Sequence, residues 1–228
     1  VGVSQLILPA IDSKTTAIMH KVKQAYPEII HLMMGLHPTH VGLNFEEELA
    51  HVKDQLDTHS FVAVGEIGMD LYWDKTYQSQ QQEALARQID WALDANLPIV
   101  IHCRDAFAPI FEVLEGVNDS RLLGVFHCFT GTKNDALRAL ELGFYLGIGG
   151  VVTFKNGKID TFLADLPLEK IVLETDSPFL APTPHRGKRN ESAYLPIIAN
   201  KMADVFNTTT AEMARITSNN AKELFDLA

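Results

Sequence analysis

Residues 61–67 read FVAVGEI, and residues 97–103 read LPIVIHC. Both runs are short, rich in β-branched residues and apolar at most positions, so they predict strands that are buried on both faces. Five further runs of the same kind occupy residues 5–11, 29–34, 122–128, 144–148 and 170–175. Amphipathic stretches separate these runs, and strands that alternate with helices form a parallel sheet.

The intervening stretches predict helices at residues 13–25, 45–56, 78–95, 106–114 and 134–142, with a short helix at 159–163. After the last strand we expect helices at residues 194–206, 211–217 and 219–227. The regular spacing and the lack of a linker favour an α/β protein with one TIM-type (β/α) barrel domain over residues 1–228. A doubly wound open sheet is the alternative.

A complete barrel of this kind has eight strands, and seven are visible here. The missing first βα unit would precede Val1, which is not a methionine. We therefore expect an N-terminally truncated barrel, and we expect the natural chain to extend upstream.

The composition limits the possible functions. A net charge of −10 argues against a protein that coats nucleic acid nonspecifically, but not against a nuclease, because bound divalent cations make a site locally positive. No apolar run approaches the roughly 20 residues of a membrane span, and no signal-peptide pattern opens the chain. Two cysteines cannot form a disulfide framework, so we expect a cytoplasmic protein.

Polar residues interrupt the apolar runs at their carboxyl ends: His37, Glu66, His102, His127 and Asp176. In a parallel barrel these strand ends converge on one face. Carboxylates and imidazoles are costly to bury unless they are paired or bind a metal. A single such histidine is usually a satisfied structural residue, but several on one face favour a functional site.

The set of Glu66, His102, His127 and Asp176 suits Zn²⁺, Mn²⁺ or Mg²⁺, and it suits two ions bridged by a carboxylate. Cys103 and Cys128 directly follow the two histidines. Neighbouring strand residues point to opposite faces, so we expect both cysteines to be buried small side chains and not metal ligands.

A concentrated basic segment lies at residues 182–192, PTPHRGKRNES, just after the last strand. Its position on the expected active face favours phosphate binding by His185 and Arg186, although a solvated charge run is the alternative. Arg104 could clamp a phosphate or form a salt bridge that holds its loop, and the sequence favours neither. Asp70 is expected to orient a ligand.

Seven segments in order resemble the TatD family of metal-dependent deoxyribonucleases. They are GLHP (35–38), VGEIGMD (64–70), IVIHCRDA (99–106), HCFTG (127–131), LETDSP (173–178), PHRGKRNES (184–192) and TSNNAKELF (217–225). Any one of them is modestly specific, but seven in the right order and spacing are very specific. The resemblance extends from about residue 6 to residue 225.

The resemblance implies an amidohydrolase-like barrel that binds two divalent ions, Mg²⁺, Mn²⁺ or Zn²⁺. It implies that Glu66 bridges the ions, that His102 and His127 bind one of them, and that Asp176 binds the other. Glu66, Asp176 and His37 would be catalytic, with Asp176 deprotonating the attacking water and His37 contacting the substrate or the leaving group.

The same resemblance implies that Arg104, His185 and Arg186 face the phosphates of a DNA substrate, at its ends or in single strands. It indicates no membrane association and no obligate protein partner.

One departure affects the metal site. The family opens with an H-x-H motif, usually within D-x-H-x-H, on its first strand, and this sequence has neither histidine. We expect truncation, and not loss of the motif, because the other segments are intact. The alternatives are an amide or ester hydrolase of the amidohydrolase type, and a non-catalytic paralogue that lacks the H-x-H motif.

Overall fold

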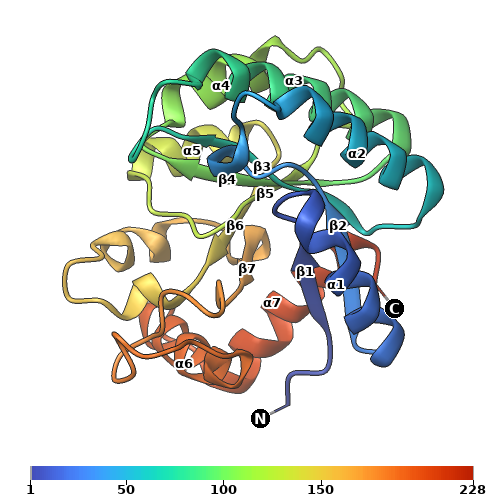
Figure 1. The fold of residues 1–228 in the computed structure, drawn as a ribbon. Coiled ribbons are helices and arrows are strands. Elements are labelled where there is room, and N and C mark those ends of the chain that lie inside the picture. The colour runs from blue at the N-terminus through green and yellow to red at the C-terminus, as the bar shows by residue number, and fades with distance from the viewer. Residues whose placement is uncertain (1, 228) are drawn as a thin grey trace. The chain divides into compact units, whose positions relative to one another are not determined.

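The computed structural model describes residues 2–227, and within them seven parallel strands follow one another in the order of the sequence. All seven predicted strands are confirmed. They are β1 (Leu6–Pro9), β2 (Ile30–Met34), β3 (Ala63–Asp70), β4 (Ile99–Arg104), β5 (Gly124–Phe126), β6 (Tyr145–Ile148) and β7 (Ile171–Leu173). Figure 1 shows these strands with the helices that connect them.

The predicted helices are found close to their expected bounds. They are α1 (Ser13–Ala25), α2 (Phe45–Thr58), α3 (Gln78–Ala95), α4 (Phe107–Gly116), α5 (Lys133–Glu141), α6 (Leu195–Val205) and α7 (Thr210–Phe225). The short helix expected at residues 159–163 is a pair of 3-10 turns, η3 (Ile159–Thr161) and η4 (Leu163–Asp165). Among the described residues, no helix combines the length and the apolar character that crossing a membrane requires.

The chain divides into two compact units. One is Ser4–Val125, and the other consists of Val1–Val3 with Phe126–Ala228, of which Val1 and Ala228 lie outside the described residues. The prediction of a single domain stays a prediction.

In the first unit, β1 pairs with β2, β2 with β3 and β3 with β4, all in parallel register. Helices α2 and α3 lie side by side over these strands, and α3 packs against β3 (Figure 1). The interface between helices and strands is apolar, with Leu49, Leu85, Ile89 and Ile99 fully buried. This packing holds β3 and β4, the two strands that carry the candidate site, in a fixed register.

Strand β3 is buried along its whole length, and its glycines let it approach β4 closely. A Cβ on Gly68 would lie 2.0 Å from the carbonyl oxygen of His102, a distance no side chain can tolerate, and the φ of Gly68 is +141°. Glycine is therefore required where the ends of β3 and β4 meet. Register pairs Gly68 with His102 and Asp70 with Arg104, which brings the polar ends of the two strands together.

In the second unit, β6 pairs with β7, and α6 and α7 pack against each other (Figure 1). The prediction of two short helices at 211–217 and 219–227 was wrong, because α7 is continuous. The predicted gap at Ser218 lies inside the helix. Two residues further on, the Asn220 side chain is buried and its Nδ2 donates to the carbonyl oxygens of Leu168 and Ile171, which ties this part of α7 to the segment around β7.

Candidate active site

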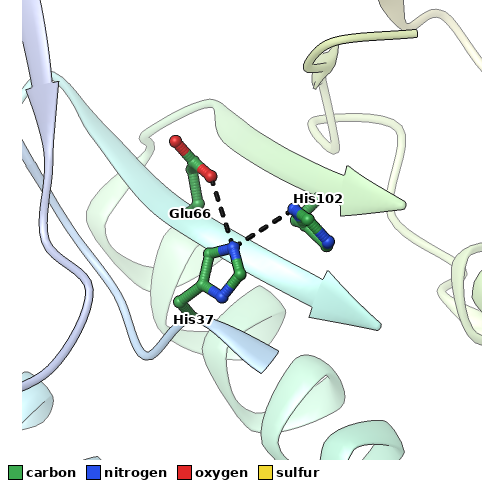
Figure 2. A group of neighbouring side chains, drawn as sticks. All are labelled: His37, Glu66 and His102. Atoms are coloured by element: carbon green, nitrogen blue, oxygen red, sulfur yellow. Dashed lines mark hydrogen bonds and ion pairs between the residues drawn. The ribbon is translucent and has the colours of Figure 1, made fainter. Parts of the chain in front are cut away.

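His37, Glu66 and His102 come together in the first unit (Figure 2). His37 follows β2, Glu66 lies within β3 and His102 within β4. The Nε2 atom of His37 is 3.1 Å from Nδ1 of His102 and 3.6 Å from Oε2 of Glu66. His37 and Glu66 are each 8% exposed, so three polar side chains converge in a nearly buried position.

These three side chains fit a divalent cation. Each offers one ligand atom, and the three atoms all lie within 4.8 Å of one another. Two atoms that bind one ion with bonds of about 2.0–2.4 Å are at most about 4.8 Å apart, so the spread of these atoms permits a shared ion. Two imidazoles and a carboxylate are also the donor types that Zn²⁺ and Mn²⁺ accept.

Asp70, the last residue of β3, fixes the orientation of His102. Its Oδ2 atom is 3.0 Å from Nε2 of His102, and its Oδ1 accepts the backbone N–H of Tyr72 at 3.1 Å. Burial alone would raise the pKa of Asp70, but the hydrogen bonds from His102 and Tyr72 and the nearby charges of His102 and Arg104 hold that pKa below its usual range. Asp70 is therefore an ionised acceptor that leaves Nδ1 of His102 facing the site, which supports its expected orienting role.

The backbone at Thr39 selects the tautomer of His37. The N–H of Thr39 donates to Nδ1 of His37 at 3.2 Å, and the Thr39 hydroxyl lies 2.7 Å from the same nitrogen. A backbone N–H can only donate, so Nδ1 is the unprotonated nitrogen and a neutral ring has its proton on Nε2. In this arrangement His37 presents a donor toward Glu66 and His102, which suits a proton-donating role better than metal ligation.

A second histidine and carboxylate pair lies in the other unit, on residues that follow β5 and β7. Nδ1 of His127 is 3.1 Å from Oε1 of Glu174, and that oxygen also accepts the N–H of Cys128 at 2.9 Å. The Nε2 atom of His127 lies 4.0 Å from Oδ1 of Asp176. Glu174 thus holds His127 as Asp70 holds His102, with the other ring nitrogen turned toward a carboxylate.

The sequence analysis missed Glu174, although a signal was present. Glu174 interrupts the apolar run at 170–175 in the way that Glu66 interrupts its own run. The neighbouring backbone is shaped around it. A Cβ on Gly147 would lie 2.5 Å from Oε2 of Glu174, so a glycine at this position leaves room for the carboxylate. Cys128 and Asp176 have φ values of 45° and 55°, left-handed conformations that are concentrated at functional sites.

The basic loop at residues 182–192 is anchored by one buried side chain. Asn190 is 1% exposed, and its Nδ2 donates to the carbonyl oxygens of Thr175 and Phe179, each at 2.6 Å. The His185 ring stacks on Tyr194 with centroids 4.1 Å apart. The Arg186 guanidinium is exposed and lies over the Phe154 ring at 4.2 Å. The loop is therefore fixed in place while its cation stays accessible.

Arg104, at the end of β4, has its guanidinium carbon 3.8 Å from the centre of the Tyr72 ring. Arg104 is exposed, so its guanidinium packs on an aromatic ring and is still accessible to solvent.

The predicted site residues form two groups: His37, Glu66 and His102 in one unit, and His127 with Asp176 in the other. Their action on the same ions stays a prediction.

The fold and the site define an α/β-barrel, metal-dependent hydrolase. The family described as TatD related DNase matches residues 1–226. The uncharacterized metal-dependent hydrolase YabD of Bacillus subtilis is 37% identical over 98% of this chain and 88% of its own length. The 3'-5' ssDNA/RNA exonuclease TatD of Edwardsiella piscicida is 33% identical over 100% of this chain and 90% of its own.

Among solved structures, YjjV, a TatD homologue from Escherichia coli, superposes with a TM-score of 0.93 at 28% identity. The superposition covers 100% of this chain and 88% of the YjjV chain. The chain belongs to the TatD family. It is a metal-dependent hydrolase with the TIM-barrel fold of that family, which confirms the predicted fold class and resemblance.

Proposed function

We propose that this protein hydrolyses phosphodiester bonds in DNA, at ends or in single strands, with two divalent cations. The observation that carries the proposal is the convergence of Glu66 and His102 with Asp70 behind the imidazole. The family description and the name of the Edwardsiella relative support a nucleic acid as the substrate. A cytoplasmic location and the lack of an obligate protein partner remain expectations.

Glu66, His102, His127 and Asp176 are the residues that would hold the divalent cations in this proposal. This assignment rests on their strand-end positions and donor atoms, and on the orientation that Asp70 and Glu174 give to the two histidines. Divalent cations bound here would neutralise charge on the phosphate and make a water molecule more acidic. Mg²⁺, Mn²⁺ and Zn²⁺ all accept this mixture of carboxylate and imidazole ligands.

The protein's own groups move the protons. Asp176 is the proposed acceptor for the proton of the attacking water. His37 is the proposed donor to the leaving oxygen, since its Nε2 is the protonated nitrogen when Nδ1 accepts from Thr39. In the structure this donor faces Nδ1 of His102. Ligation through that Nδ1 would take away the acceptor, and the N–H of His37 would then be available to the substrate.

Arg186, His185 and Arg104 are the proposed phosphate-binding groups. Arg186 and Arg104 are exposed, and each has one face of its guanidinium on an aromatic ring. The planar fork is then pre-organised, while its N–H groups remain available to a phosphate. An anionic substrate is more consistent with these groups than the neutral amide or ester of the alternative function.

The test is to assay a single-stranded oligonucleotide, a nicked duplex and an acyl ester in parallel. Chelation should abolish DNA hydrolysis, and added Mn²⁺, Mg²⁺ or Zn²⁺ should restore it. His37→Ala should lower kcat about 100-fold or more, the usual loss for a general acid. Hydrolysis of the ester without hydrolysis of DNA would favour the amidohydrolase alternative. If the protein binds DNA but does not hydrolyse it with any of the three metals, the result would favour a non-catalytic paralogue.

A further inference from the structure

Two large aromatic side chains are exposed immediately beside the candidate site. Tyr72 is 51% exposed and Trp73 is 75% exposed, and both follow the end of β3 directly. Aromatic residues of this size usually contribute to stability by being buried, and a tryptophan exposed to this extent contributes little. Their exposure on consecutive residues is more consistent with contact to a ligand.

The two rings and Arg104 form one arrangement, which we call the aromatic corner. The Tyr72 and Trp73 rings are perpendicular, with an interplanar angle of 89° and centroids 4.7 Å apart. The guanidinium carbon of Arg104 lies 3.8 Å from the centre of the Tyr72 ring and 5.4 Å from that of Trp73. The aromatic corner therefore presents an indole and a guanidinium, two flat surfaces, to the solvent.

The aromatic corner is joined to the candidate site through short hydrogen bonds. The carboxylate of Asp70 that holds His102 through Oδ2 accepts the N–H of Tyr72 through Oδ1. The backbone of Arg104 is also joined to this segment, because its carbonyl oxygen accepts the N–H of Leu71 at 2.9 Å. A ligand on the aromatic corner would thus be held at a fixed position relative to His102.

Flat aromatic and guanidinium surfaces are what unpaired nucleobases stack on. Bases inside a duplex already have both faces covered by their neighbours, so such surfaces select single strands or frayed ends. We propose that the aromatic corner stacks unpaired bases of a nucleic acid strand whose scissile phosphate lies at Glu66 and His102. This inference rests on the proposed function, and it assigns Tyr72, Trp73 and Arg104 to substrate selection.

Trp73 can report the contact itself. The chain has two tryptophans, and Trp91→Phe leaves Trp73 as the single indole. This variant, with its divalent metal, is titrated with single-stranded DNA whose terminal linkages are phosphorothioates that resist cleavage. We expect the tryptophan emission to be quenched, and we expect no quenching by an oligonucleotide of equal length and charge with abasic terminal nucleotides. Equal effects of the two oligonucleotides, or none, would overturn the proposal.

Kinetics give the second measurement. Trp73→Ala should lower kcat/KM on single-stranded DNA by about 5- to 100-fold, the cost of losing one stacked base. It should change kcat/KM on the abasic-ended strand by less than about 2-fold, since there is no base to lose. Trp73→Phe should retain most of the activity. Ile18→Ala, which alters a 63% exposed side chain on helix α1, is the matched control and should change neither value.

The outcomes separate the two proposals. A wild-type protein that hydrolyses no nucleic acid overturns both the proposed function and the role of the aromatic corner. A wild-type protein that hydrolyses normal and abasic-ended strands equally well, and whose Trp73→Ala variant behaves as wild type on both, keeps the proposed function and overturns the stacking proposal.

Discussion

Asp70 and His102 form a carboxylate–imidazole pair in which Oδ2 of Asp70 lies 3.0 Å from Nε2 of His102. Asp70 is 4% exposed and its second oxygen is occupied by the N–H of Tyr72. The pair therefore sets which ring nitrogen of His102 faces Glu66 and His37. An imidazole held in this way is a better and more selective metal ligand than one that is free to rotate.

Asp70→Asn should weaken metal binding about 10- to 100-fold, the usual cost of losing such a partner. An amide can present its oxygen to His102 or to the N–H of Tyr72, and its NH₂ group then opposes a donor at the other contact. Metal affinity is measured by titrating the metal-free protein with Mn²⁺ or Zn²⁺. Binding is detected by calorimetry and by the recovery of activity. Asp74→Asn, which changes an exposed carboxylate on the same loop, is the control. Equal metal affinity in wild type and Asp70→Asn would contradict the role.

Gly147→Ala tests the equivalent pair in the other unit. The new Cβ would lie 2.5 Å from Oε2 of Glu174, so the carboxylate must leave its contact with His127. We expect activity to fall about 10- to 100-fold. The crowding should cost about 1–3 kcal/mol of unfolding free energy.

Gly116→Ala provides the matched comparison, because a Cβ there would meet nothing within 4 Å. Metal-dependent activity and urea unfolding are measured on both variants. If Gly147→Ala unfolds as expected but keeps full activity, the orientation of His127 by Glu174 has no functional role.

Arg186→Ala should weaken substrate binding, and the slope of log affinity against log salt should become shallower by about one phosphate contact. Arg186 is exposed, and its contact with Phe154 is a surface cation–π pair, so the unfolding free energy should change by only about 0.5–1 kcal/mol. Binding is measured by fluorescence anisotropy across a range of salt concentrations, with Lys14→Ala as the control. A large loss of stability with unchanged affinity would show that the loop is structural.

His31 predicts how stability varies with pH. Its Nε2 atom is buried without a hydrogen-bond partner among the described residues, in a pocket also lined by His20, Lys23 and His59. Burial, and then the charge of Lys23, lowers the pKa of His31. The folded state therefore favours the neutral ring, and protonation below the ordinary pKa of about 6.5 favours the unfolded state. The free energy of unfolding is therefore at its full value above about pH 6.5. It decreases as the pH falls from about 6.5 toward the lowered pKa of His31 in the folded protein.

Thermal melting of the wild type should accordingly show a decline in the melting temperature between pH 7.5 and pH 5.5. His31→Gln removes the titrating group and should reduce that decline. An unchanged pH dependence in this variant would mean that other groups account for the acid sensitivity.

The strands and helices of this fold could be predicted because their patterns are local. The apolar runs located all seven strands, and the helix at residues 13–25 was predicted with its observed bounds. The break predicted at Ser218 was wrong, and the contacts that hold this part of α7 are not local. The carbonyl oxygens that accept the side-chain hydrogens of Asn220 belong to Leu168 and Ile171, about 50 residues earlier.

In the candidate site too, local patterns could be read from the sequence and contacts between distant residues could not. Glu66, His102 and His127 were singled out because each interrupts an apolar run near its carboxyl end, and strand ends meet. Asp70, the last residue of β3, was expected to orient a ligand, and its contact with Nε2 of His102 supports that role. Glu174 was missed, and its contact with His127 spans 47 residues. Thr39 was missed because its backbone N–H, present in nearly any residue, makes the contact with His37.

The carboxylate of Asp70 is shared, with one oxygen on the imidazole of His102 and the other on the backbone of Tyr72. A ligand that displaces the Tyr72 backbone would therefore also displace the Asp70 carboxylate, which orients the imidazole of His102. If substrate on the aromatic corner tightens the hold on the ion, thermodynamic reciprocity requires the ion to tighten the hold on substrate by the same factor. Metal occupancy and substrate occupancy would then be cooperative through a single side chain.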